Sequence, residues 1–200
     1  MNEHLELADW RRQVQALYAR VREERDPGSA HDLWRATRDS LFRNHPQSPL
    51  LPDDPLRETG IGYWDYRDEL RFRLPVLEAP EPLELSLPSG ADGDTPMRRI
   101  GQVELPSPFD ARVDVWWLMT YGGGLFLPLK DASAGTVTYG GGRYLLDTTK
   151  GADLGGEEGW LVIDLNFLYH PSCRYNPRWQ CPLAPPGNTI ASPIPAGELL

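Results

Sequence analysis

The spacing of hydrophobic positions changes near residue 60, from a helical period to that of strands. In residues 3–25 apolar side chains recur at helical spacing with Arg and Glu on the opposite face, the apolar set being Trp10, Val14, Leu17, Tyr18 and Val21. A second amphipathic helix is predicted to start at Ser29, because Ser29 and Asp32 have the spacing of a capping box. Pro46 ends this helix. The first 45 residues therefore predict a helical pair.

Beyond a linker rich in proline and acid at 46–60, apolar and polar residues alternate, which is typical of half-buried strands. The strands expected from this alternation are 70–74, 83–87, 99–105, 111–120, 125–130, 136–139, 143–147 and 160–168. Short strands broken by Gly and Pro predict a sandwich or a small barrel-like sheet. The fold class is therefore mainly β with two N-terminal α-helices, α+β overall.

These elements predict one compact domain in four parts. They are the helical pair 1–45, the proline-rich linker 46–60, the β domain 61–170 and a proline-rich C-terminal segment 171–200. Because proline fixes φ and lacks an N–H donor, we expect the last segment to form no regular structure and to wrap the surface.

Composition and charge argue against nucleic acids and membranes as partners. The chain of 200 residues has a formal net charge of −9, which repels a phosphate backbone and argues against nucleic-acid binding. No run of apolar residues reaches the ~20 that a membrane span needs, and the N-terminal residues lack the pattern of a secretory signal. We therefore expect a cytoplasmic protein without membrane contact, and the oligomeric state stays open.

Polar side chains concentrate in the segments 131–147 and 164–181. A carboxylate or an amide within a strand is expected to face solvent or to line a cavity with partners. The candidates for general acid–base catalysis are Asp131, Asp147 and Asp164. The candidates for ligand binding are Ser133, Thr138, Tyr139, Arg143, Tyr144, Asn166, Tyr169 and Tyr175.

The same segments carry a family resemblance. Its motifs are Asp131-x-Ser133-x-Gly135, Thr138-Tyr139, Gly142-Arg143-Tyr144, Asp164-x-Asn166, Tyr169, Pro171, Cys173, Tyr175 and Cys181-Pro182 through Asn188, with Trp34-x3-Arg38-Asp39, Pro46-Gln47-Ser48-Pro49-Leu50 and Ile194-x-Ala196-Gly197-Glu198 outside them. The chain resembles domain-of-unknown-function family 1684, and it departs from the family pattern at Leu165, where Phe is expected, and at His170, where Asn is expected. The resemblance implies a mainly β protein of bacteria and no particular activity.

Two cysteines and a histidine raise the question of a metal or redox centre. His170, Cys173 and Cys181 are zinc ligands by type, with Asp164 as a fourth, but a spacing of seven residues between the cysteines is unusual for structural zinc. We therefore predict no metal and no cofactor. A disulfide is possible, although two reduced thiols are favoured in a reducing compartment.

Three functions remain open from the sequence. In the leading one the protein binds a small polar molecule: Arg143 holds a carboxylate or phosphate, and Tyr139, Tyr144, Tyr169 and Trp179 wall the pocket. In the second it is a hydrolase that uses the candidate aspartates. In the third it is a structural or interaction module, in which Arg143 pairs internally with Asp131 or Asp164 and only fastens the C-terminal segment.

Overall fold

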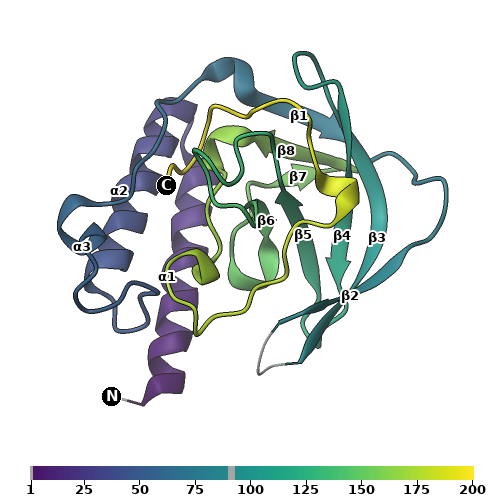
Figure 1. Cartoon of the computed structure of the whole chain (residues 1–200). Coiled ribbons are helices and arrows are strands. Elements are labelled where there is room, and N and C mark those ends of the chain that lie inside the picture. Colours follow the sequence, from purple (N-terminus) through teal and green to yellow (C-terminus); the bar gives the residue numbers. More distant parts are fainter. Residues whose placement is uncertain (1, 90–92) are drawn as a thin grey trace.

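Two long helices open the chain in a computed structural model that describes residues 2–89 and 93–200 (Figure 1). Helix α1 spans Glu3–Glu23 and α2 spans Pro27–Asn44. The expected start of the second helix at Ser29 is wrong, since Asp26 is its N-cap and accepts a hydrogen bond of 2.8 Å from the Ser29 backbone N–H. Proline at the first helical position explains the earlier start, because its fixed φ suits the helix and its missing N–H is not needed there.

The strands form two antiparallel sheets. The larger holds β2 (Glu84–Pro88), β3 (Asp94–Leu105), β4 (Ala111–Leu118), β5 (Gly124–Leu129) and β6 (Arg143–Asp147), five strands paired in that order. The smaller sheet has three strands in the order β1 (Arg71–Pro75), β8 (Trp160–Asp164) and β7 (Gly156–Glu157). The expected class, mainly β with N-terminal helices, is therefore confirmed.

Two expected strands differ from the structure. Residues 136–139 form a turn, in which the Gly135 N–H donates to the Thr138 carbonyl, and not a strand. The strand expected over 160–168 ends at Asp164, whose side chain accepts the Asn166 N–H and turns the chain into the 3-10 helix η4, Leu165–Phe167. In both places a polar side chain or a glycine provides a local hydrogen bond that competes with the sheet. The linker also holds a short helix, α3, over Leu56–Thr59.

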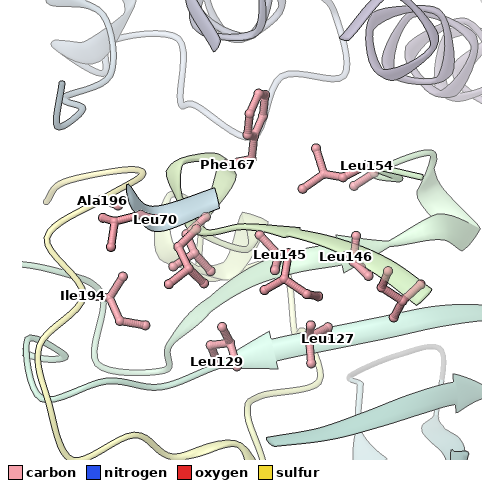
Figure 2. Packing of buried hydrophobic residues seen from close by; sticks show 14 of the residues in the cluster. Leu70, Leu127, Leu129, Leu145, Leu146, Leu154, Phe167, Ile194 and Ala196 are labelled. Carbon is pink, nitrogen blue, oxygen red and sulfur yellow. The ribbon is translucent and has the colours of Figure 1, made fainter. Parts of the chain in front are cut away.

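The C-terminal segment is part of the core. It includes the 3-10 helices η5 (Ser172–Arg174) and η6 (Pro186–Asn188), and its residues Ile190, Ile194 and Ala196 are almost fully buried. Figure 2 shows Ile194 and Ala196 lying among core leucines of β5 and β6 and Leu70. The expectation that this segment forms no regular structure is therefore wrong at the two 3-10 helices, and the segment packs into the core in addition to covering it. Prolines stop a ladder of hydrogen bonds but leave the residues between them free to pack.

The main hydrophobic cluster joins both sheets to the helices. Tyr18 of α1 and Trp34 of α2 belong to the same cluster as Leu127, Leu145 and Ile163 of the strands. Residues of α1, α2 and β6 also line one cavity between the helices and the larger sheet. Within the part of the chain that the structure describes, no helix combines the length and the apolar character needed to cross a bilayer.

Candidate functional site

Arg143, the first residue of β6, is enclosed by the C-terminal segment. Its side chain is 1% exposed and forms an ion pair of 2.8 Å with Asp131. The same guanidinium donates to the backbone carbonyls of Ala196 and, at 3.1 Å, Ile194. Arg143 therefore faces the carbonyls of its own chain and not an open pocket, which is the internal pairing considered above.

Asp131 is held by more than this ion pair. It accepts hydrogen bonds from the Ser133 N–H at 2.9 Å, the Ser133 hydroxyl at 2.6 Å and the Ile194 N–H at 3.1 Å. Burial alone raises the pKa of the Asp131 carboxyl, but Arg143 and these donors outweigh burial and hold the pKa below its ordinary value. The Ser133 hydroxyl also lies 3.0 Å from that of Thr138. Four predicted site residues thus form one closed network.

A second buried ion pair joins α2 to the C-terminal segment. Arg38 contacts Glu198, which is completely buried. Glu198 also accepts the His170 backbone N–H at 2.5 Å and the Tyr175 hydroxyl at 3.0 Å. Arg38 and Glu198 lie in motifs of the resemblance, but their pairing could not be predicted from spacing, since they are 160 residues apart.

A cavity of about 90 Å³ lies between the two helices and β6, and we call it the helix–sheet cleft. It is lined by side chains from α1, α2, β6 and the residues that follow, among them Tyr18, Arg38, Tyr144, Asp147, Lys150 and Tyr169. Tyr144, Asp147 and Tyr169 were predicted site residues, whereas Tyr18, Arg38 and Lys150 were not. Tyr18 was assigned to the helical core by its spacing, and Arg38 was named only in a motif of the family resemblance.

Asp147 is one of two residues of the cleft, together with His170, that have a buried polar atom without a hydrogen-bond partner. Its side chain is 4% exposed, and Oδ2 lies 3.5 Å from the Nζ of the exposed Lys150. Its other oxygen, Oδ1, is buried without a hydrogen-bond partner. Burial raises the pKa of the neighbouring Tyr169 hydroxyl, and the negative charge of Asp147 adds to this effect. The phenol therefore stays protonated and is a hydrogen-bond donor at neutral pH.

Asp164 and Asn166 lie elsewhere, beside a pocket of about 360 Å³ that we call the arginine pocket after Arg22, Arg25, Arg71 and Arg73. Asp164 accepts the Asn166 side-chain amide at 2.7 Å and the Tyr66 hydroxyl at 3.2 Å, with the Arg71 Nε at 3.6 Å. Burial raises the pKa of Asp164 to about 6, which these partners oppose only in part. The arginines were scattered in sequence and carried no pattern that predicted this pocket.

Tyr139 and the two cysteines line a third hollow, a groove of about 730 Å³ that we call the thiol groove. The two ring nitrogens of His170 have neighbours other than the cysteines. Its Nε2 accepts the Tyr139 backbone N–H at 3.2 Å, and its Nδ1 lies 3.6 Å from Glu198. Over residues 2–89 and 93–200, no three His, Cys, Asp or Glu side chains form a group that could hold a metal ion. The predicted site residues are thus divided among several places.

The fold and these sites define an α+β protein with two antiparallel sheets, a covering helical pair and a C-terminal segment fastened by buried ion pairs. Residues 58–199 match the family described as Protein of unknown function (DUF1684), and the chain belongs to that family. This confirms the resemblance inferred from the motifs, although the helix motif at Trp34 and the linker motif at Pro46 lie outside the matched residues.

One similar solved structure is the solution NMR structure of an uncharacterized protein of Haloarcula marismortui. It has a TM-score of 0.61 and 25% sequence identity, and the match covers 84% of this chain and 91% of that one. No curated protein matches the chain.

Proposed function

We propose that the protein binds a small polar molecule in the helix–sheet cleft. The observation that carries this proposal is the buried Oδ1 of Asp147, which has no hydrogen-bond partner beside a cavity. An unsatisfied buried carboxylate oxygen costs free energy, typically about 1–3 kcal/mol and more for a charged group. A ligand hydroxyl or amide N–H that reaches Oδ1 removes this cost on binding.

The charges around the cleft favour a neutral ligand. Arg38 is already paired with Glu198, and Asp147 lies 3.5 Å from Lys150. An anion would meet the carboxylate of Asp147, and a cation would meet Lys150 and Arg38. The cavity of about 90 Å³ restricts the enclosed part of the ligand to a few non-hydrogen atoms. Small polyols and primary amides meet these conditions.

Thermal unfolding with a panel of small polyols and primary amides tests the proposal. We expect at least one compound to raise the melting temperature of the wild type, and Asp147→Asn to abolish or strongly reduce that shift, because the acceptor oxygen is replaced or turned away. Asp153→Asn is the matched control, since Asp153 is a half-buried acid on the same stretch of chain that pairs with Arg22 and does not line the cleft. An equal shift in wild type and Asp147→Asn contradicts the assignment to this cleft.

A second candidate function is hydrolysis of an anionic substrate in the arginine pocket. It is favoured by the pKa of Asp164, which burial raises to about 6 and thus toward the value that suits a general acid or base near neutral pH. Asp131 does not support catalysis in this way, since its pKa is lowered and its carboxylate is already paired with Arg143. The arginines provide donors for a phosphate or carboxylate group, although Arg22 and Arg73 also pair with Asp153 and Glu157.

Chromogenic substrates distinguish this candidate from simple binding. We expect a phosphate monoester or carboxylate ester of p-nitrophenol to be turned over by the wild type, and Asp164→Asn to lose the activity while its fold, followed by circular dichroism, persists. Turnover that survives in Asp164→Asn, or that is absent in the wild type, counts against hydrolysis at this site.

The proposed setting is the bacterial cytoplasm, with a small molecule and not a nucleic acid as the partner. The net charge of −9 supports the exclusion of nucleic acid. If no compound shifts the unfolding temperature and no substrate turns over, the third function is favoured, in which the buried ion pairs only hold the C-terminal segment in place.

A further inference from the structure

The segment that carries both cysteines is folded back on itself. The Tyr175 N–H donates to the Ser172 carbonyl at 3.0 Å, and the Trp179 N–H donates to the Asn176 carbonyl at 3.1 Å. These two turns return the chain, so that Cys173 and Cys181 line the same thiol groove. Both are free and half-buried. The pair is therefore reachable from solvent without any opening of the core.

The two thiols lie near enough for each to shift the pKa of the other, and their surroundings make them unequal. The hydrogen bond from Cys181 lowers the pKa of Cys173 to about 6 against the opposing effect of burial, and the Tyr139 hydroxyl acts in the same direction as Cys181. The same contact and burial raise the pKa of the Cys181 thiol. At neutral pH one sulfur is thus a thiolate and its neighbour a thiol.

The geometry points to a new chemical site: we propose that Cys173 and Cys181 form a reactive dithiol that low-molecular-weight disulfides oxidise to an intramolecular disulfide. Cys173 is the attacking sulfur and Cys181 the resolving sulfur. This reaction differs from the small-molecule binding and from the hydrolysis proposed above, although Cys181 also lines the helix–sheet cleft.

The exchange proceeds in two balanced steps. The Cys173 thiolate attacks one sulfur of a disulfide RSSR, forming the Cys173–S–S–R bond and releasing RS⁻. The Cys181 thiol then loses its proton to the released RS⁻, which becomes RSH, and attacks the Cys173 sulfur. The Cys173–Cys181 bond forms and the second RS⁻ leaves, taking a proton from solvent. The protein is oxidised by two electrons, and RSSR is reduced to two RSH.

The surroundings of Cys181 favour the resolving step. The carbonyl of the next residue, Pro182, accepts the hydroxyl of the buried Tyr144 at 2.5 Å, which ties the chain at that point to β6. Cys181 also packs against the cluster formed by Trp116, Phe126 and their neighbours. Because this sulfur is held in place beside Cys173, the second step is intramolecular and needs little movement.

Oxidised glutathione is the probe for the experiment. The wild type, incubated with it at neutral pH and measured by intact mass, is expected to lose two hydrogen atoms and to retain no glutathione, with peptide mapping placing the cross-link between Cys173 and Cys181. Cys181→Ser, which keeps a hydroxyl donor next to Cys173, is expected to trap glutathione on Cys173. Cys173→Ser is expected to react more slowly than Cys181→Ser, because burial still raises the pKa of the remaining Cys181 thiol once the Cys173 sulfur is gone.

The pH dependence of the alkylation rate distinguishes a thiol of lowered pKa from one that is only exposed to solvent. In Cys181→Ser, alkylation of Cys173 is expected to reach half its maximal rate below the ordinary thiol value of about 8.5, because Tyr139 and the substituted hydroxyl still favour the thiolate. Both variants unfolded in denaturant must react alike, as the control. The proposal is overturned if the wild type keeps two titratable thiols in excess oxidised glutathione, or carries two glutathione adducts with no cross-link. The wild-type result decides even if a variant fails to fold.

Discussion

The two ends of strand β6 each hold a buried charged residue, and the two side chains differ in their hydrogen-bond and ion-pair partners. At the first position, Arg143 is met by Asp131 and by backbone carbonyls of the C-terminal segment. At the last position, Asp147 has one carboxylate oxygen 3.5 Å from an exposed lysine and one with no partner. The strand between them is buried throughout.

The difference comes from what covers each end. The C-terminal segment passes over Arg143 and supplies the carbonyls of Ile194 and Ala196, whereas the helices approach Asp147 and leave a cavity. A polar residue inside a strand is therefore not by itself a sign of a binding site. It becomes one when an atom without a hydrogen-bond partner also lies beside a cavity, as Asp147 Oδ1 does. The Arg143 Nε also lacks a partner, but the C-terminal segment encloses it.

The largest expected effect is that of removing Arg143. Arg143→Ala leaves the Asp131 carboxylate buried without its counter-ion, and breaking a buried pair in this way costs about 3–5 kcal/mol. We expect urea unfolding to show a loss of that size. Arg112→Ala is the control, since Arg112 pairs with Glu104 on the surface, with more than half of each side chain exposed, and such pairs contribute about 0–1 kcal/mol.

A loss from Arg143→Ala no larger than that from Arg112→Ala contradicts the view that Arg143 fastens the C-terminal segment. A ligand-dependent loss, present only with a small anion in the buffer, restores instead the sequence-based hypothesis that Arg143 binds a ligand.

Much of the fold could be predicted from the hydrophobic pattern, because periodicity reports which face of an element is buried. The helical pair and the strands at Arg71–Pro75, Ala111–Leu118 and Arg143–Asp147 follow from it. The turn at 136–139 and the early end of the strand at Asp164 do not, because they depend on single local hydrogen bonds. The burial of Ile194 could not be predicted either, since the prolines on both sides of it leave no periodic pattern of apolar and polar residues.

The candidate site was predictable in residue type but not in arrangement. Asp131, Ser133, Thr138 and Arg143 are close in sequence and meet in space. Asp164, in contrast, lies beside the arginine pocket. Arg38 and Glu198 pair across 160 residues, a distance at which spacing carries no information about contact. Which side chains share a cavity is decided by the packing of whole elements.

A smaller effect on stability is expected from His170, which contacts Glu198 and lines the cleft. Burial lowers the pKa of His170 to about 4, with nearby Arg143, Arg174 and Arg38 acting in the same direction and Glu198 against it. Because this base has a lower pKa folded than unfolded, its contribution to stability is complete above about pH 6.5 and is lost as the pH falls toward 4.

His170→Asn is therefore expected to flatten the pH dependence of stability between about pH 6.5 and 4, by up to about 3 kcal/mol at the acid end. Asn keeps the backbone donor to Glu198 and offers an acceptor for the Tyr139 N–H. His31, whose pKa burial also lowers to about 4, and Asp164, whose raised pKa acts in the opposite sense, are present in both proteins and cancel in the difference. Parallel stability curves for wild type and variant are the contrary result.

The smallest effect is expected at the open end of β6. Asp147→Asn keeps the shape of the side chain and removes a charge whose Oδ1 has no partner, so the free energy of unfolding is expected to change by no more than about 1 kcal/mol. Asp131→Asn makes the same chemical change at the closed end, where it leaves Arg143 buried and unpaired, and is expected to cost about 3–5 kcal/mol. Urea unfolding of the two variants at pH 7 measures the contrast directly. If Asp147→Asn costs as much as Asp131→Asn, both ends of the strand are structural and the case for a ligand at Asp147 fails. If it is neutral or stabilising, Asp147 is not needed for the fold, and its burial beside a cavity requires an explanation from function.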